Sequence, residues 1–359
     1  MDSHGANDDV RLAAEPSRTI AHRGRTVSIE VVVEGTFVPH VISEATVDDL
    51  LREAVSLVMA TGERIVPSKG PCLEVSAVSL ELRRPLARAS RTETRGTIFS
   101  CVGELLWYLA GSNDVEHIAY YVPRYRESAE NGLVYGGYGP RLFNQRGHNQ
   151  IQQVIDMLRT KPDSRQAVVQ LFEAQDLVEP HRDVPCTCSL QFLLRSNGLR
   201  LVVYMRSNDL FLGTPHDIFA FTMIQEIVAR SLQVELGTYV HMVGSLHIYE
   251  TNMEDLDRFL AEGWQTTELE MPPMPCGDPW PSVQELVRFE ESLRMGADPL
   301  EAVIPADPYW GDIARLLVVY SLSKLGRWDD VQTVATQFVH GFYRVFVDDR
   351  LDRDTGRDQ

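Results

Sequence analysis

The sequence predicts an α+β fold, in which a mixed β-sheet is surrounded by helices. Its strand-like segments follow one another in hairpin order, instead of alternating regularly with helices as in a doubly wound sheet. Apolar runs flank Asn197-Gly198, a pair that is typical of a two-residue hairpin turn. The glycine-rich nucleotide motifs of doubly wound folds are missing, because the segment Gly-Gly-Tyr-Gly at 136–139 has neither their spacing nor their lysine.

Composition indicates an ordinary soluble globular protein: of its 359 residues, 44% are hydrophobic and 24% are charged. The net charge of −17 disfavours a nucleic-acid polymer or an anionic membrane as a partner, although a local group of arginines still allows an anionic small substrate. No apolar run reaches the roughly 18 residues of a membrane-spanning helix. The acidic N-terminus lacks the layout of a signal peptide, so we expect a cytoplasmic protein.

Five cysteines occur, at positions 72, 101, 186, 188 and 276. Their odd number and irregular spacing do not suggest a disulfide framework, which agrees with a reducing compartment. Cys186 and Cys188 lie two positions apart, but no second close pair of Cys or His completes a metal site. We therefore expect no metal cofactor.

The N-terminal part begins with a polar segment, residues 1–20, that we expect to be disordered. Val27–Val38 is predicted as a short strand pair around a Glu-Gly turn. Thr46–Ala60 has the apolar spacing of an amphipathic helix, with Thr46 as its N-cap. After a loop rich in Pro and Gly, Cys72–Leu82 is predicted as a strand.

Thr97–Ala110 is predicted as a strongly apolar helix that carries one acid, Glu104, among apolar neighbours. The elements predicted after it are a glycine-rich loop at 132–139, a helix at Gln150–Thr160, a strand at Gln166–Phe172, the hairpin, a helix at Ile218–Leu232, a strand at Gly237–His247, a proline-rich linker at Pro272–Pro281 and three helices within Ser282–Asp349. The predicted organisation is a tail at 1–20, a main domain at 21–274 and a helical extension at 275–359.

The hairpin places a cysteine beside basic and polar side chains. If Asn197-Gly198 forms the turn, Cys186 lies opposite Asp209 and within reach of Arg206 and Ser207. A thiol beside a guanidinium is expected to be held as the thiolate, which is the nucleophilic form. The alternative for a single cysteine is a buried structural role.

Six motifs in a fixed order then point to a known family. They are Glu-Leu-Leu-Trp-Tyr-Leu-x-Gly at 104–111, Tyr-Gly at 138–139, Pro-Asp-Ser-Arg at 162–165, Pro-Cys-x-x-x-x-Gln-Phe at 185–192, Arg-Ser-x-Asp-x-x-Leu-Gly-x-Pro at 206–215 and His-x-Tyr at 247–249. Over about residues 60–270 the sequence resembles thymidylate synthase and its nucleotide hydroxymethylase relatives, in particular the (deoxy)cytidylate 5-hydroxymethylase branch. The resemblance implies a thymidylate synthase-like sheet within 21–274.

The resemblance also implies a reaction. Cys186 matches the family nucleophile, which adds to C6 of a pyrimidine nucleotide so that C5 attacks the one-carbon unit of the co-substrate 5,10-methylenetetrahydrofolate. Glu104 matches the catalytic glutamate, a carboxyl suited to proton transfer. Tyr138 matches the tyrosine that positions a water or proton near C5, although Tyr135 can be aligned there instead. Asp209 matches the residue that binds the pterin, and Gly213 lies in the same folate-binding motif.

Nucleotide contacts are implied in the same way. Arg206, Ser207 and Arg165 match the phosphate contacts, and Arg165 would come from the other subunit of a homodimer. The early loop is expected to add a further cation, either Lys69 or Arg64, with Lys69 preferred. At the end of one strand, His247 and Tyr249 point to the same side of the pleat and match the family's contacts to the sugar hydroxyls.

One departure from the family concerns the base. Thymidylate synthases carry Asn at the position of Asp217, where an amide donates to O4 and accepts from N3 of uracil. An ionised carboxylate only accepts hydrogen bonds, so Asp217 is predicted to select the amino-bearing ring of cytosine. The alternative is that Asp217 merely caps a helix that begins at Ile218. Thr187 replaces the family histidine whose water network lies around uracil O4, which agrees with a change of base.

Two further departures concern the reaction. Both tryptophans of the segment that covers the one-carbon intermediate are replaced, and the chain end lacks the short apolar tail that closes the thymidylate synthase site. A less apolar cover favours capture of the intermediate by water over reduction by hydride. The sequence thus predicts a folate-dependent transferase that makes 5-hydroxymethyl-dCMP or 5-hydroxymethyl-CMP. The alternatives are reductive methylation of dUMP or dCMP, a catalytically silent nucleotide-binding module, and a thiol hydrolase.

Overall fold

The computed structural model describes residues 19–22, 25–28, 39–92, 97–264, 266 and 268–355. The chain divides into two compact units, residues 1–39 and residues 40–359. In the first unit, β1 (Thr19–His22) and β2 (Arg25–Ser28) pair antiparallel. The disordered tail expected at 1–20 lies outside the described residues except for positions 19 and 20. The same is true of the strand pair expected at 27–38, of which only positions 27 and 28 are described, as part of β2.

The second unit contains a mixed sheet, which confirms the predicted fold class. Its strands are β3 (His40–Glu44), β4 (Glu63–Ile65), β5 (Cys72–Leu82), β6 (Val168–Gln170), β7 (Thr187–Arg195), β8 (Gly198–Met205), β9 (Asn208–Asp209) and β10 (Leu236–Tyr249). They follow the order β3-β5-β10-β8-β7-β6, with β4 beside β5 and β9 beside β10. The sheet is mixed because β10 runs antiparallel to β5 and parallel to β8.

Helices form where the sequence provides apolar stripes and caps. The first helix, α1 (Val47–Thr61), begins after Thr46, whose side chain accepts a hydrogen bond from the Asp49 backbone N–H as predicted. The other α-helices of the first three quarters of the chain are α2 (Ile98–Leu109), α3 (Val115–Ala119), α4 (Tyr125–Ser128), α5 (Tyr138–Phe143), α6 (Gln150–Thr160), α7 (Thr214–Leu232) and α8 (Met253–Ala261). No described helix is long and apolar enough to cross a membrane.

The hairpin exists, but its turn lies one residue earlier than predicted. Arg195 pairs with Gly198, so Ser196 and Asn197 form the turn and Gly198 opens β8 with a positive φ of 104°. A β-bulge between Thr187 and Ser189 shifts the register again. As a result, Cys186 lies opposite Arg206 and not opposite Asp209: the Arg206 backbone N–H donates to the Cys186 carbonyl at 2.9 Å.

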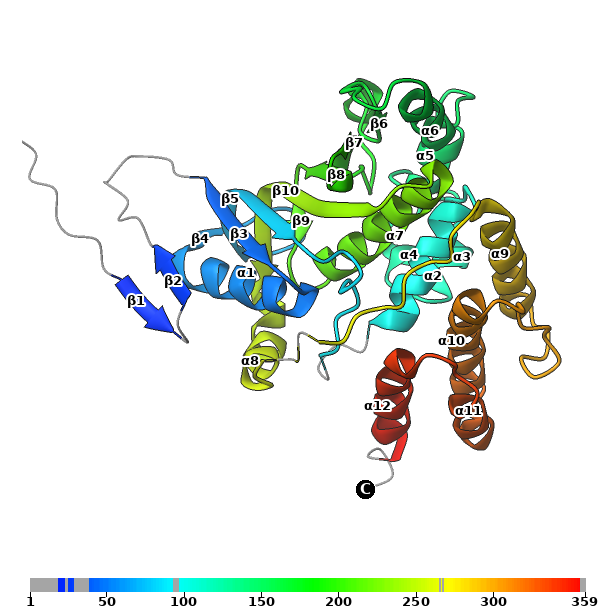
Figure 1. The fold of residues 1–359 in the computed structure, drawn as a ribbon. Coiled ribbons are helices and arrows are strands. Elements are labelled where there is room, and N and C mark those ends of the chain that lie inside the picture. The colour runs from blue at the N-terminus through cyan, green and yellow to red at the C-terminus, as the bar shows by residue number, and fades with distance from the viewer. Residues whose placement is uncertain are drawn as a thin grey trace, which may run out of the picture. The chain divides into compact units, whose positions relative to one another are not determined.

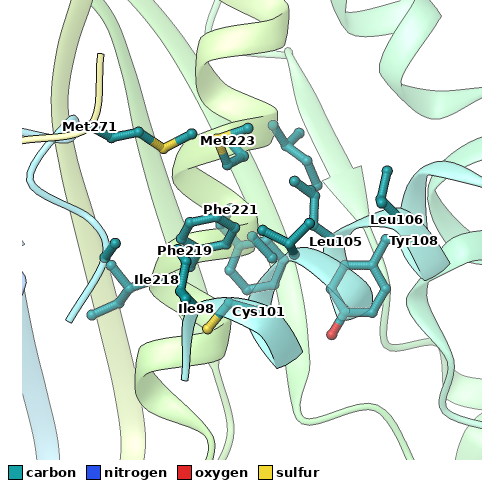
Figure 2. Packing of buried hydrophobic residues seen from close by; sticks show 14 of the residues in the cluster. Ile98, Cys101, Leu105, Leu106, Tyr108, Ile218, Phe219, Phe221, Met223 and Met271 are labelled. Carbon is teal, nitrogen blue, oxygen red and sulfur yellow. The ribbon is translucent and has the colours of Figure 1, made fainter. Parts of the chain in front are cut away.

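The core that supports the site lies between α2, α7 and the sheet. Both helices are almost entirely buried, and Figure 2 shows their side chains meeting there, among them Cys101 and Leu105 of α2 and Phe219 of α7. In Figure 1, α7 runs along the sheet beside α2. Helix α7 begins at Thr214, four residues before the predicted start, because Pro215 is tolerated in a first helical turn. Asp217 therefore lies inside that first turn, and the residue at the N-cap is Gly213.

The C-terminal region packs on the same unit. Residues 280–355 form four α-helices and not the three predicted: α9 (Trp280–Arg294), α10 (Pro308–Lys324), α11 (Trp328–Ala335) and α12 (Arg344–Thr355). The proline-rich segment before them is anchored, because the Met271 N–H donates to the Leu86 carbonyl and the Met274 N–H donates to the buried Glu226 carboxylate. Helix α10 packs against α2 and α9, so the extension supports the helix that carries Glu104.

Candidate active site

A cavity of about 850 Å³ opens beside the ends of β8 and β10 and the start of α7. Of the residues predicted from the sequence to form the site, the cavity brings together the following: Lys69, Glu104, Tyr138, Cys186, Arg206, Ser207, Asp209, Gly213, Asp217, His247 and Tyr249. Arg165 does not line it and is exposed elsewhere on the chain. Among the described residues, no group of three His, Cys, Asp or Glu side chains is arranged to hold a metal ion.

Cys186 follows Pro185 at the start of β7, with its thiol beside Arg206. The guanidinium of Arg206 donates to the Pro185 carbonyl at 3.0 Å and to the Val184 carbonyl at 2.9 Å, and one of its nitrogens lies 3.7 Å from Cys186 Sγ. Burial nevertheless raises the pKa of Cys186 to about 11, although Arg206 opposes this shift. The expectation of a preformed thiolate is therefore wrong, because Arg206 does not offset the desolvation of the sulfur. At neutral pH the group is mainly the thiol.

This pKa predicts the reactivity of Cys186. Alkylation by iodoacetamide should become about tenfold faster per pH unit below the pKa of about 11, because only the thiolate reacts. Mass analysis of the peptide that contains Cys186 would measure the rate, with Cys186→Ser as the blank. Arg206→Met should slow alkylation at any given pH, since it removes the charge that lowers the thiol pKa. A rate already at its plateau at pH 7 would contradict the raised pKa.

Glu104 lies on α2 and is buried, as predicted. Its Oε1 accepts hydrogen bonds from the hydroxyls of Tyr108 at 2.8 Å and Tyr125 at 2.6 Å. Burial raises the pKa of both tyrosines, so both remain donors. Two donors hold Oε1 in place and leave Oε2 as the oxygen available for proton transfer. The sequence reasoning missed both tyrosines, although Tyr108 follows Glu104 at the i+4 spacing that places two side chains on one helix face.

Tyr138 opens α5 and points its hydroxyl at the start of β7. The backbone N–H of Thr187 donates to the Tyr138 hydroxyl oxygen at 3.1 Å, and the Thr187 side chain donates to it at 2.9 Å. The pKa of Tyr138 is raised by burial, so the phenol keeps its proton and can donate it to a group in the cavity. Tyr135 instead stacks on His181 and does not line the cavity, which favours Tyr138 of the two aligned tyrosines.

Asp217 extends from the first turn of α7 into the cavity, and Asn208 holds one of its oxygens. The Asn208 side-chain N–H donates to Asp217 Oδ2 at 2.8 Å. The amide of Asn208 is oriented in turn, because its oxygen accepts from Thr214 at 2.7 Å and lies 2.9 Å from Nε2 of the buried His241. Burial, and secondly the charge of Glu104, raise the pKa of Asp217 well above its ordinary value. This shift favours the neutral form of the carboxyl over the ionised form expected from the sequence, and a neutral carboxyl would offer one donor as well as an acceptor.

The residues assigned to the folate and the sugar lie at the strand ends. Asp209 Oδ1 accepts from the backbone N–H groups of Phe211 at 2.9 Å and Leu212 at 3.0 Å, which fixes the carboxylate with Oδ2 available to a ligand. His247 and Tyr249 lie at the end of β10, with ring centroids 5.0 Å apart, and both line the cavity. The arrangement can present acceptor and donor groups to hydroxyls on one wall of the cavity.

Cations gather at the cavity in spite of the acidic chain. Lys69 lines the cavity, whereas Arg64 forms an exposed ion pair with Glu250 at 2.6 Å, so Lys69 is the cation of the early loop that faces the site. Arg206 lines the cavity as predicted. Two further basic residues of the lining, Arg124 and Arg182, were missed by the sequence-based prediction. Four positive side chains around one cavity suit an anionic substrate.

These features match one family of enzymes. The sequence model described as "Thymidylate synthase" matches residues 58–276, and the chain belongs to the thymidylate synthase family. Over 239 residues it is 31% identical to a protein named deoxyuridylate hydroxymethyltransferase from Bacillus phage SP01, an alignment that covers 61% of this chain and 62% of that protein. It is 30% identical over 289 residues to a protein of the same name from Pseudomonas phage M6. This alignment covers 76% of this chain and 81% of that protein.

A third relative is a cellular enzyme. The chain is 31% identical over 179 residues to a protein named thymidylate synthase from Francisella philomiragia, with 45% of this chain and 65% of that protein aligned. The chain thus spans somewhat less than two thirds of the length of two of these relatives. The predicted family is confirmed, and with it the thymidylate synthase fold of the central region.

Proposed function

We propose that the protein transfers the one-carbon unit of 5,10-methylenetetrahydrofolate to C5 of a cytidine nucleotide, dCMP or CMP, and that water captures this unit to give the 5-hydroxymethyl nucleotide. The chain belongs to the thymidylate synthase family, and one of its cavities is lined by Cys186, Glu104 and Asp217. The observation that carries the proposal is that this cavity has an acid, Asp217, at the position expected to read the base. The folate supplies the one-carbon unit at the oxidation level of formaldehyde. Water capture leaves tetrahydrofolate, without oxidation of the folate.

Each side chain has a defined task in this reaction. Cys186 loses its proton and forms a bond from Sγ to C6, which makes C5 nucleophilic. Glu104, held through Oε1 by two tyrosines, exchanges protons with the ring through Oε2. The Tyr138 hydroxyl, free to donate, holds a water near C5. C5 bonds to the methylene carbon of the folate and then loses its proton, and the bond from that carbon to the folate nitrogen breaks with its electron pair leaving on nitrogen. C5 then carries an exocyclic methylene, which is the electrophile that water attacks.

Binding is assigned by charge and hydrogen-bonding capacity. Arg206, Ser207 and Lys69 would hold the phosphate, with Arg206 as the fork-shaped donor. His247 and Tyr249 would bind the sugar, and Asp209 with Gly213 would bind the pterin. Ribose and deoxyribose both remain candidates for the sugar, because none of these groups selects the 2′ position by itself.

Hydroxymethylation is favoured over methylation by the cover of the cavity. Its mouth is lined by Arg124, Glu127, Ser128 and Arg182, which are polar and attract water to the one-carbon unit. Transfer of a hydride would instead need a dry, apolar cover. Two of the relatives are named hydroxymethyltransferases, which agrees with this choice.

The base is assigned to cytosine through Asp217, with uracil as the second candidate. A neutral carboxyl can donate its O–H to N3 of cytosine and accept from the N4 amino group, so no protonated N3 is needed. The same carboxyl can donate to O4 of uracil and accept from its N3–H. The raised pKa of Asp217 is compatible with either base, and the names of the two phage relatives are the observation that favours uridylate.

Side-by-side assays test the proposal. The protein is incubated with CMP, dCMP, UMP or dUMP together with methylenetetrahydrofolate, and the products are identified by mass. We expect a gain of one CH₂O unit on a cytidine nucleotide, without the absorbance increase of dihydrofolate. A mass gain on uridine nucleotides alone would establish the second candidate, and a methyl product with dihydrofolate would refute hydroxymethylation.

We further propose that the protein is a homodimer formed through the open face of its sheet. Val168, Tyr204 and Met242 lie on one face of β6, β8 and β10 and are each about two fifths exposed, at 40%, 44% and 42%, whereas α7 covers the other face. Arg165 is exposed outside the cavity of its own chain, as expected if it completes the phosphate site of a second copy.

Charge on this face should break the dimer. Met242→Glu is expected to convert the dimer into a monomer, because it places a carboxylate inside the apolar interface. Light scattering during gel filtration would measure the mass, and Leu300→Glu, at an exposed site on the C-terminal extension, is the control. Arg165→Ala should raise KM for the nucleotide and leave the mass unchanged. A wild-type protein of monomeric mass would contradict the dimer.

A further inference from the structure

One acidic side chain of the cavity has no task so far. Asp183 lies three residues before Cys186, in the segment that leads into β7, and it lines the cavity. The other carboxyls of the lining are either held by donors, as Glu104, Asp209 and Asp217 are, or exposed at the mouth, as Glu127 is. Within the described part of the chain, Asp183 accepts no hydrogen bond and forms no ion pair.

The position of Asp183 is set by a glycine. A Cβ atom at Gly136 would collide with Asp183 Oδ2, so the carboxyl lies directly against the backbone of the loop between α4 and α5. That loop lines the cavity through Val134, Gly136 and Gly137, and so does Tyr125, whose hydroxyl binds Glu104. The charge of Asp183 influences both Tyr125 and Cys186. The carboxyl thus lines the same cavity as the nucleophile, three residues before it in the chain and against the loop that leads to Tyr138.

A water that adds to the methylene on C5 has to lose a proton, and the acceptor needs an unoccupied lone pair beside the cavity. We propose that Asp183 is the general base for water capture, a role that rests on the proposed hydroxymethylation. Lys69, Arg206 and Arg141 act on this carboxyl to lower its pKa, and Glu130 acts to raise it, but burial is the largest influence and raises the pKa. The raised pKa makes the carboxylate a better proton acceptor.

The step balances without an oxidant or a reductant. The water oxygen bonds to the methylene carbon while the carboxylate of Asp183 takes one of its protons. The π electrons of the exocyclic double bond form the C5–C6 double bond, and the bond from C6 to Cys186 Sγ breaks with the electron pair leaving on sulfur. The products are the hydroxymethyl nucleotide, protonated Asp183 and the Cys186 thiolate. A proton passed from Asp183 to the sulfur restores the starting thiol.

The test separates the step before water capture from capture itself. Nucleotide labelled with tritium at C5 releases tritium when Cys186 has added and C5 has bonded to the one-carbon unit. Asp183→Asn should retain tritium release but lose hydroxymethyl product by about 100-fold, which is the scale of a general base. Added 2-mercaptoethanol should then trap the methylene as a thioether, since a thiolate needs no base. Gly136→Ala, which displaces the carboxyl, should give the same pattern. The matched control is Glu179→Gln, because Glu179 is an exposed acid four residues before Asp183 that does not line the cavity.

Each outcome decides the proposal. If Asp183→Asn loses tritium release and product in parallel, or retains both, Asp183 is not the base for water capture. Should Asp183→Asn fold poorly, Gly136→Ala displaces the same carboxyl without changing it. Its Cβ would also lie 3.1 Å from the Pro185 nitrogen, so retained tritium release is the check that Cys186 has kept its position. If the wild-type protein releases tritium and forms a methyl product, the proposed hydroxymethylation fails, and this result is visible before any variant is made.

Discussion

Replacing Cys186 by serine is expected to reduce turnover by about four orders of magnitude or more, the scale seen when an essential nucleophile is removed. A serine hydroxyl is a far weaker nucleophile than a thiolate, and no described side chain hydrogen-bonds position 186 as a base would. The measurement is steady-state formation of hydroxymethyl nucleotide, together with tritium release from C5, which should fall in parallel because both need the bond to C6.

The matched control is Cys188→Ser. Cys188 is also half-buried and lies on β7, but it does not line the cavity. Its replacement should leave turnover close to that of the wild type. Nucleotide binding by Cys186→Ser, measured by calorimetry, should persist because the phosphate and sugar contacts remain. Turnover that survives in Cys186→Ser would remove the covalent mechanism, and an unchanged biological effect of this variant would favour a catalytically silent nucleotide-binding module.

Replacing Asp217 by asparagine is expected to shift the preference for the base from cytosine to uracil. The Asn208 N–H would keep the new amide oxygen beside it, as it now holds Asp217 Oδ2, so the amide NH₂ group would face the base. A fixed donor opposes the N4 amino group of cytosine and pairs with O4 of uracil. A mismatched buried polar group costs about 1–3 kcal/mol, which corresponds to a change in the ratio of kcat/KM of roughly 5- to 160-fold.

The measurement is kcat/KM for matched cytidine and uridine nucleotides with the wild type and the variant. Asp209→Asn is the control: it removes a carboxylate from the same cavity, and it should raise KM for the folate without changing the ratio between the bases. An unchanged ratio in Asp217→Asn would show that residue 217 does not read the base. If the wild type already prefers uridylate, a neutral Asp217 carboxyl would bind the base as the family's asparagine amide does, by donating to O4 and accepting from N3 of uracil.

The sequence predicted best those elements whose pattern is local. The strand Cys72–Leu82 and the helix Gln150–Thr160 have the predicted bounds, because each is framed by its own turn residues and caps. The turn of the hairpin was misplaced for a non-local reason: at Gly198 a side chain would collide with the Glu235 carbonyl, a residue 37 positions later that leads into β10. A contact between segments so far apart in the sequence cannot be predicted from the residues around the turn.

The candidate site shows the same difference between features set by the local sequence and features set by contacts between distant segments. Motif spacing identified the residues that line the cavity, but not how their surroundings change them. The pKa values of Cys186 and Asp217 both depart from the sequence-based expectation, because both depend on burial that is complete only after α7, β7 and β8 have packed together. Tyr125, which binds Glu104 from 21 positions further along the chain, was missed for the same reason.

The packing of α10 on α2 has a consequence for protein engineering. Phe99, five residues before Glu104 on α2, stacks on Tyr320 of α10 with ring centroids 6.2 Å apart, and Tyr120 shares a hydrogen bond with Ser321 of the same helix. A truncated protein that ended at the family boundary near residue 276 would expose this aromatic surface to solvent. The C-terminal helices thus support the helix that carries Glu104, and chimaeras that exchange them between relatives would have to carry the matching residues of α2 along.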